Sequence, residues 1–539
     1  MHRREFLRDT LAAGAATGNL PLSFAPAGRR VADPRAPVAP PPFELEEATV
    51  AALQEGMRSG KWTARGIAER YLARIEAMDK AGAAINAVIE TNPDALAIAE
   101  RLDEERKSGR TRGPLHGIPV LVKDNLDSGD RMATTAGSLA LMGSPAPRDS
   151  TVVERLRAAG AVLLGKTNLS EWANYRSTNS TSGWSGRGGL TKSPYVLDRN
   201  ACGSSSGSGA AAAANFAAVT IGTETDGSVT CPCSISALAG IKPTIGLVSR
   251  AGIVPISATQ DTAGPMCRTV ADVAVVLQAI QGFDPRDPAT APMRGRAVPD
   301  LAGSLKPDAL KGARLGVARK GFGLPSSVEP VLSEAIAALK QLGATIVDPA
   351  EIPNVAKLGD PETVVLDFEF KAGIAAYLAG RGDTVKPKTL ADLIAFNTAH
   401  QDSEMPWFAQ EIFERSEKRG PLTTPAYLKA HAACRRLSRA MGIDAVMTRH
   451  RLDAVIAITV GPSWPTDLVN GDRFTGGCTT PAAVAGYPHV TVPAGQVHGL
   501  PVGLSFFGRA WSEASLLRLA HAFEQETRLR RPPRFLPSL

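Results

Sequence analysis

Two serines, each in a glycine-rich turn, are the residues of this sequence best placed to do chemistry. Ser204 lies in the run CGSSSG, and Ser228 lies in the run ETDGSVT. Small residues and then the β-branched run VTI separate them, which predicts a helix and a strand that bring the second turn back beside the first. Two hydroxyls presented side by side, with a base in reach, are typical of acyl transfer through a covalent intermediate.

Lys123 is the candidate base. It follows the apolar run PVLV at 119–122, which predicts a buried strand with the lysine at its end. Desolvation disfavours the ammonium form, so we expect the pKa of Lys123 to fall from about 10.4 to roughly 8. The alternative is a surface lysine that extends from a strand end into solvent.

Taken together, these three segments resemble the amidase signature family of serine hydrolases, from about residue 45 to the C-terminus. The resemblance rests on the strand-end Lys-Asp pair, on a Gly/Ser loop that aligns without gaps to residues 202–207, and on a nucleophile turn that aligns to residues 224–230. It implies that Ser228 is the nucleophile, Ser204 a bridging serine and Lys123 the base. It also implies a cis peptide bond between Gly203 and Ser204.

The resemblance further implies an α/β fold, a single large domain with a central mixed twisted β-sheet flanked by helices. The expected reaction is hydrolysis of a carboxamide C–N bond through an acyl-enzyme, with no cofactor and no metal. The expected oxyanion hole consists of the backbone N–H groups of Thr225, Asp226, Gly227 and Ser228. Asp124 and Ser205 are expected to support the triad by hydrogen bonding.

Several residues depart from the usual family motifs. Asp226 replaces a glycine beside the nucleophile, Thr230 replaces a common arginine, and Cys202 and Ser206 replace glycines in the first loop. These variants look most like the peptide amidase branch, which removes the amide from peptide C-termini. Amidases of small aliphatic or aryl amides, the glutamine-hydrolysing subunit of a tRNA amidotransferase and a non-catalytic amide-binding protein are the alternatives.

The composition is that of a protein with a large core. The chain has 539 residues, 44% of them hydrophobic and 21% charged, with a net charge of +7. Because aromatics make up only 5% and no Lys/Arg block is interleaved with them, we expect no nucleic-acid partner. The resemblance implies a small-molecule or peptide amide substrate. No segment is apolar for long enough to insert stably in a membrane. The oligomeric state is open.

Six cysteines are scattered along the chain without the paired C-x-x-C spacing of a zinc site. We interpret them as small packing residues with no disulfide framework. Two alternatives concern particular cysteines: Cys231 and Cys233 as a redox pair, and Cys202 as a thiol nucleophile.

The first 27 residues predict a targeting segment. The string RREFLR, a mildly apolar stretch and Ala25-Pro26-Ala27 are typical of a twin-arginine export signal, and a basic disordered N-terminus is the alternative. We therefore expect a periplasmic or secreted protein, with a proline-rich linker at 28–45 and a catalytic domain at 46–539. Within that domain, residues 351–439 predict mostly helices, which we expect to form the walls of the substrate site.

Overall fold

A mixed β-sheet of eleven strands runs through the computed structural model, which describes residues 40–143 and 145–539. Parallel pairs join β3, β2 and β6 and also β11, β9 and β10, and antiparallel pairs join the other neighbours. In sheet order the strands are β1 (Val88–Thr91), β3 (Val162–Thr167), β2 (Pro119–Lys123), β6 (Val219–Glu224), β8 (Thr262–Cys267), β7 (Ala239–Lys242), β12 (His489–Val497), β13 (Leu500–Phe507), β11 (Ala454–Ile458), β9 (Arg314–Val317) and β10 (Thr345–Val347).

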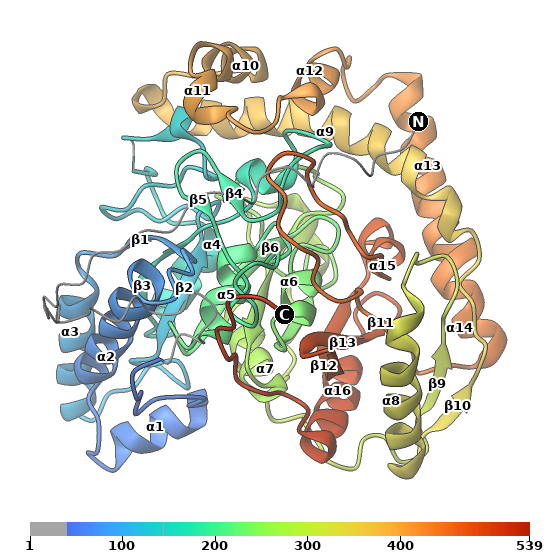
Figure 1. Cartoon of the computed structure of the whole chain (residues 1–539), viewed down its shortest axis with the longest axis horizontal. Helices are drawn as coiled ribbons and strands as arrows, with labels where there is room; N and C mark the ends of the chain where they lie inside the picture. The colour runs from blue at the N-terminus through green and yellow to red at the C-terminus, as the bar shows by residue number, and fades with distance from the viewer. Residues whose placement is uncertain (1–39, 144) are drawn as a thin grey trace, which may run out of the picture. The chain divides into compact units, whose positions relative to one another are not determined.

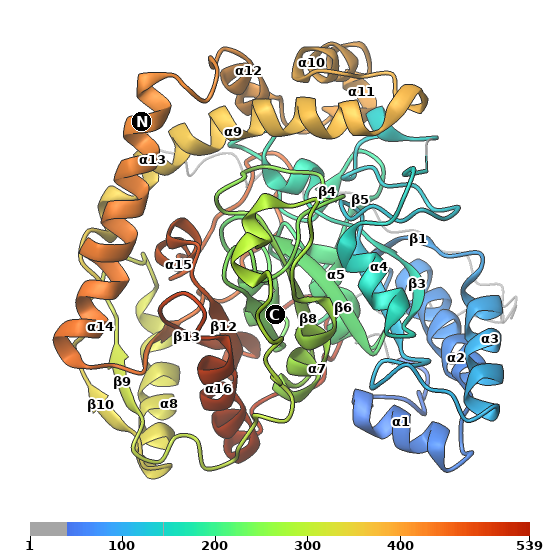
Figure 2. The same ribbon diagram turned by 180° about the vertical axis from the view of Figure 1, so that it is seen from behind.

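Helices flank this sheet, which confirms the predicted fold class (Figure 1). Near the first strands lie α1 (Val50–Arg58), α2 (Ala64–Ile75), α3 (Ala95–Lys107) and α4 (Thr151–Ala158). Against the middle and the second half pack α5 (Ser206–Ala213), α6 (Thr230–Ile235), α7 (Val270–Ile280), α8 (Glu329–Gln341), α15 (Thr480–Ala485) and α16 (Glu513–Thr527). Figure 2 shows α16 between α7 and α8, both of which it contacts.

Local sequence explains where several of these helices begin. Thr63 precedes α2 in extended backbone and accepts a hydrogen bond from the N–H of Gly66, as expected of an N-cap. Buried side chains of α2, such as Ile67, Tyr71 and Ile75, then recur at helical spacing and join the main hydrophobic core.

A second group of helices confirms the helical prediction for residues 351–439. The group consists of α9 (Gly359–Gly380), α10 (Leu390–Ala399), α11 (Gln401–Glu404), α12 (Glu411–Glu417), α13 (Pro425–Ser438) and, after a short irregular turn, α14 (Asp444–His450). Figure 1 shows α9 and α13 meeting at one corner, where the two helices pack together. This group has its own small core, in which Trp172, Phe370 and Phe413 lie close together.

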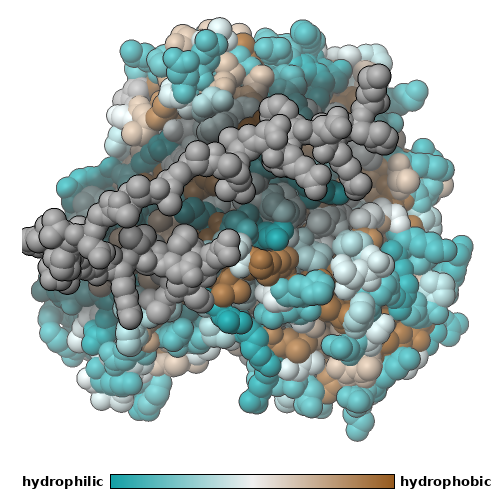
Figure 3. All heavy atoms as spheres, viewed as in Figure 1, coloured by the Kyte–Doolittle hydropathy of each residue, from teal (hydrophilic) through white to brown (hydrophobic). Residues whose placement is uncertain are grey.

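The described residues belong to one compact unit that begins at Pro37, so the predicted signal at 1–27 and most of the predicted linker at 28–45 lie outside them. None of the helices within residues 40–143 and 145–539 has the length and hydropathy needed to cross a bilayer. Mostly hydrophilic side chains cover the face seen in Figure 3, with hydrophobic ones in smaller groups.

Candidate active site

Lys123 is the last residue of β2, a strand that lies between β3 and β6 and is buried along its whole length. Its side chain is fully buried. The Nζ atom lies 2.7 Å from Oγ of Ser204, 2.9 Å from Oγ1 of Thr223 and 3.4 Å from the carbonyl oxygen of Thr223. The strand-end lysine therefore contacts one of the two serines that the sequence singles out.

Burial lowers the pKa of the Lys123 side chain to about 7, and the negative charges of Asp261 and Glu224 oppose this shift only in part. No carboxylate among the described residues lies within ion-pair distance of its Nζ. The buried amine therefore loses its proton far more readily near neutral pH than an exposed lysine does, and a neutral amine has the lone pair that a proton acceptor needs.

The Ser204 turn is held by close packing around Gly203. The peptide bond between Gly203 and Ser204 is cis, as the resemblance implied. A Cβ atom on Gly203 would lie 2.1 Å from Oγ of Ser170, so any larger residue would displace that side chain. The carbonyl oxygen of Ser204 accepts a hydrogen bond from the N–H of Ser170 at 3.1 Å, which fixes the turn against a neighbouring loop.

The second serine turn follows β6 and is bonded to the first. The N–H of Ser205 donates to the carbonyl oxygen of Ser228 at 3.2 Å. Ser204 and Ser228 both line one open cavity of about 620 Å³. In the described part of the chain the Ser228 hydroxyl makes no side-chain hydrogen bond, so the Lys123–Ser204 contact is the one link of the expected relay that is present as a hydrogen bond.

The backbone at Thr225–Ser228 offers unpaired donors to this cavity. Across residues 40–143 and 145–539, none of these four N–H groups donates a hydrogen bond. By contrast, the carboxylate of Glu224 accepts from the next two, those of Val229 at 2.8 Å and Thr230 at 2.9 Å. Gly227 has φ of 80°, which explains the glycine in the turn. The four free N–H groups are those expected to form an oxyanion hole.

Asp226 and Thr230, two departures from the family motif, each make defined hydrogen bonds at the nucleophile turn. The half-buried Asp226 carboxylate lines the cavity and accepts hydrogen bonds from the hydroxyls of Thr479 and Thr480, both at 2.6 Å. Burial raises the pKa of Asp226 to about 6, against the effect of these hydroxyls. The Thr230 hydroxyl donates to Glu224 at 3.1 Å, so it supports the nucleophile turn from behind.

Of the two residues expected to support the triad, Ser205 bonds to a neighbour of Lys123, whereas Asp124 bonds elsewhere. Ser205 exchanges hydrogen bonds with the backbone of Thr223, donating to its carbonyl oxygen at 3.0 Å and accepting from its N–H at 3.2 Å. Ser205 thereby holds a direct neighbour of Lys123. Asp124 instead accepts from the Thr135 hydroxyl and the N–H of Gly137, and makes no hydrogen bond to the lysine or to either serine in the described residues.

Three residues of this network are absent from the sequence predictions. The Thr223 hydroxyl contacts Lys123 and accepts from the side-chain amide of Asn125 at 3.0 Å. The Asp261 carboxylate accepts from the Thr225 hydroxyl at 2.6 Å, at the start of the nucleophile turn. Parallel pairing of β2 with β6 could have indicated Thr223, because the ends of the two strands must lie side by side.

The interpretation of Cys202 and Cys231 as packing residues without a disulfide is wrong. A disulfide bond joins them, so Cys202 is not a free thiol nucleophile and Cys231 is not paired with Cys233. The loop at Cys202 and the helix that begins at Thr230 meet at the wall of the cavity, which brings the two sulfurs together although 29 residues separate them in sequence. Cys233, Cys267, Cys434 and Cys478 are buried and free, as packing residues would be.

These features define a protein of the amidase class, and the comparisons agree. The family model described as Amidase matches residues 66–517, and the chain belongs to this family. The native peptide amidase from Stenotrophomonas maltophilia, a solved structure, is 50% identical with a TM-score of 0.88, over 92% of this chain and all of that chain.

Curated relatives include a probable amidase of Arabidopsis thaliana, 41% identical over 92% of this chain and 93% of its own length. A glutamyl-tRNA(Gln) amidotransferase subunit of Chloroflexus aurantiacus is 35% identical over 90% of this chain and 97% of its own length. Within the described residues, no cluster of three or more His, Cys, Asp or Glu side chains is arranged to hold a metal ion.

Proposed function

We propose that this amidase is a serine hydrolase that removes the C-terminal carboxamide of peptides and releases ammonia. The observation that carries the proposal is the fully buried Lys123 amine, 2.7 Å from the Ser204 hydroxyl beside a cavity that Ser228 also lines. A neutral lysine in contact with a serine is the base that an otherwise unreactive hydroxyl requires.

In the proposed mechanism, Oγ of Ser228 attacks the amide carbon while its proton passes to Ser204, which gives its own proton to Lys123. The N–H groups of Thr225–Ser228 donate to the oxygen that becomes negative, and each such donor contributes about 3 kcal/mol in comparable sites. The C–N bond then breaks as the relay returns a proton to the nitrogen, and ammonia leaves. Water attacks the acyl-enzyme through the same relay and releases the carboxylic acid.

Support for a peptide substrate comes from the cavity and from the similarity to the peptide amidase. The cavity of about 620 Å³ is large enough for more than a small aliphatic amide, and its lining combines polar groups with apolar side chains. The apolar side chains come from the loop that leads to the first serine turn, from α9 and α12, and from the segment before α15: Tyr175, Leu366, Ile412, Trp464 and Phe474.

A substrate panel tests this proposal against the alternatives. Ammonia release would be measured for an N-acylated dipeptide amide, free glutamine, a short aliphatic amide and an aryl amide, and cleavage of an internal peptide bond would be followed separately. We expect kcat/KM for the dipeptide amide to exceed that for glutamine by at least about 100-fold, because contacts along the peptide add transition-state binding. A preference for glutamine or an aryl amide would contradict the proposal that peptide amides are the substrate. Binding without hydrolysis would indicate a non-catalytic amide-binding protein.

We also propose that the protein is exported through its N-terminal twin-arginine motif to the periplasm or the medium. The Cys202–Cys231 disulfide supports this, since disulfides persist mainly outside the reducing cytoplasm. Replacing Arg3 and Arg4 with lysine should leave the protein in the cytoplasmic fraction. Unchanged distribution between fractions would contradict export by this route.

A further inference from the structure

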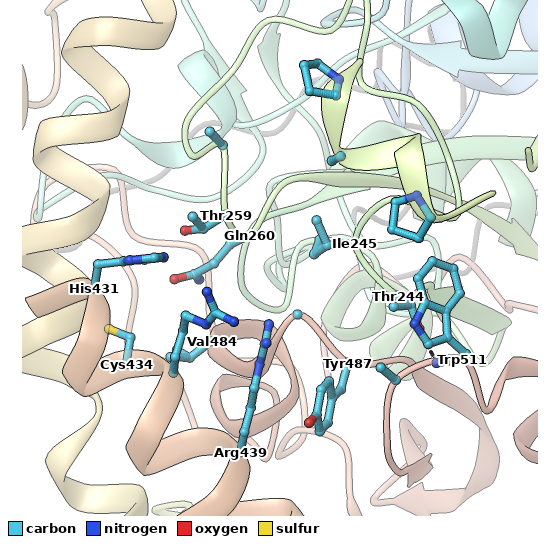
Figure 4. Close-up of a pocket in the computed structure, with 17 residues that line it drawn as sticks. Thr244, Ile245, Thr259, Gln260, His431, Cys434, Arg439, Val484, Tyr487 and Trp511 are labelled. Carbon is cyan, nitrogen blue, oxygen red and sulfur yellow. Dashed lines mark hydrogen bonds between the residues drawn. The ribbon is translucent and has the colours of Figure 1, made fainter. Parts of the chain in front are cut away.

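A second cavity, of about 510 Å³, lies apart from the catalytic residues and has no role in the proposed reaction. Figure 4 shows His431 entering it from α13 and Arg439 from the turn that follows, with Tyr487 and Trp511 on another side. Gln260 and Thr259 form part of its wall. Because segments far apart in the sequence build it, this hollow belongs to the tertiary fold rather than to one loop.

The charges that line this cavity are all of one sign. Among the described residues, the charged side chains that line it are Arg435 and Arg439, and no Asp or Glu does. Four acids lie behind or beside this lining and already accept hydrogen bonds: Glu362 from Gln260, Glu369 from Thr259, Glu513 from the N–H of Thr244, and Asp444, in an adjoining hollow, from the Tyr487 hydroxyl. Lining of this kind is complementary to an anion.

The two arginines keep most of their hydrogen-bonding capacity unused. Nε of Arg439 donates to the carbonyl oxygen of Ala485 at 2.8 Å, and its guanidinium lies over the Tyr487 ring, 5.4 Å from the ring centre. Neither contact neutralises its charge. The Arg435 side chain has no hydrogen bond and no ion pair within the described residues. Guanidinium groups pair with carboxylate or phosphate oxygens through two parallel hydrogen bonds, and an anion in the cavity would supply those acceptors.

Gln260 separates this cavity from the nucleophile turn. Its side-chain amide donates to the carbonyl oxygen of Thr225 at 3.3 Å and to the carboxyl group of Glu362 at 2.8 Å. The same residue thus lines the second cavity and contacts the first residue of the expected oxyanion hole. The two cavities are distinct, but they share this wall.

We propose that the cavity between α13, residues 258–260 and residues 484–487 is a binding site for a small oxyanion, a carboxylate or a phosphate, held by Arg435 and Arg439. The aromatic faces of Tyr487 and Trp511 supply an apolar side for the rest of such a ligand. This proposal does not depend on which amide the enzyme hydrolyses.

Isothermal titration calorimetry at constant ionic strength tests the site, with inorganic phosphate in one arm and citrate in the other. We expect saturable binding of at least one anion at millimolar concentration, and the stronger arm identifies the preferred chemistry. Arg435→Glu should weaken that binding at least about tenfold, since it removes charge-assisted hydrogen bonds and adds repulsion. Because the Arg435 side chain makes no hydrogen bond or ion pair in the described residues, the substitution should leave the melting temperature unchanged.

Arg449→Glu is the matched control. Arg449 is an exposed arginine of α14 outside the cavity lining, without an ion pair among the described residues, so the change in net charge is the same. Binding by this variant should equal that of the wild type. The proposal is overturned if neither anion saturates, if Arg435→Glu binds as tightly as the wild type, or if Arg449→Glu loses as much affinity.

Discussion

Replacing Lys123 with methionine should abolish activity and change how the stability of the protein depends on pH. Methionine has a similar length and no charge, so it fills the same buried space without the cost of desolvating an ammonium group. In the wild type, the pKa of Lys123 falls from 10.5 to about 7 on folding. This shift corresponds to a destabilisation of about 5 kcal/mol when the lysine of the unfolded chain is fully protonated.

The sign of the pH effect follows from this direction. Because the pKa of Lys123 is lower in the folded state, the unfolded chain binds more protons between pH 7 and 10.5, and stability rises with pH across that window. The destabilising contribution of the lysine is present in full below pH 7 and disappears above pH 10.5. Between pH 7 and 9 the wild type should gain about 2 kcal/mol relative to Lys123→Met, which lacks this titration.

Urea unfolding of both proteins at pH 7, 8 and 9, followed by tryptophan fluorescence, measures this difference. In parallel, kcat/KM of the wild type should rise through a pKa near 7 and then level off, as expected of a base that must be neutral. A difference in unfolding free energy that is the same at all three pH values would refute the reasoning. An activity that is already maximal well below pH 6 would also refute it. Either result would mean that Lys123 does not titrate near pH 7 in the folded protein.

Three further substitutions test other parts of the site. Ser228→Ala should reduce kcat by at least about a thousandfold. Its melting temperature should be unchanged, because the Ser228 hydroxyl has no side-chain partner in the described residues. Burst kinetics with an activated ester would show whether an acyl-enzyme still forms. Cys231→Ala removes a cross-link between residues 29 apart and should cost about 3 kcal/mol of stability, seen as a lower melting temperature that reductant no longer changes. Asp226→Asn should strengthen inhibition by the peptide acid product about tenfold at pH 8, since a carboxylate in the cavity wall repels the product carboxylate; equal inhibition constants would instead assign Asp226 a purely structural role beside α15.

The residues proposed to carry the chemistry each have a strong local signal in the sequence. Lys123 follows an apolar strand, and Ser204 and Ser228 lie in turns so rich in glycine that close backbone packing is the natural explanation. Thr223 has no such signal, since a threonine within a strand is common in any sheet. Its contact with Lys123 depends on the parallel pairing of β2 with β6, which is a property of the tertiary fold.

Residues 351–439 could be predicted as helices that form walls of the site, and α9 and α12 do line the cavity, but the particular side chains that line it could not be predicted. Helical periodicity indicates which face of each helix is buried, while the partner of that face is set by long-range packing. Asp226 is a second example of a residue whose role depends on distant parts of the chain. Its carboxylate is oriented by Thr479 and Thr480, more than 250 positions away along the chain, so no local pattern could distinguish a turn cap from a cavity residue.

The disulfide also bears on the nucleophile of the proposed mechanism, because it removes one candidate thiol. A thiolate attacks more readily than a hydroxyl, so a free Cys202 beside Ser204 would compete for the substrate carbonyl. With its sulfur bonded to Cys231, Cys202 has no thiol, and the remaining cysteines are buried with no lining position in the cavity. The burial that raises the pKa of Cys233 and Cys267 also makes those thiols poor nucleophiles. This is consistent with the proposed mechanism, in which an oxygen atom attacks the amide carbon and needs the neutral amine of Lys123 as its base.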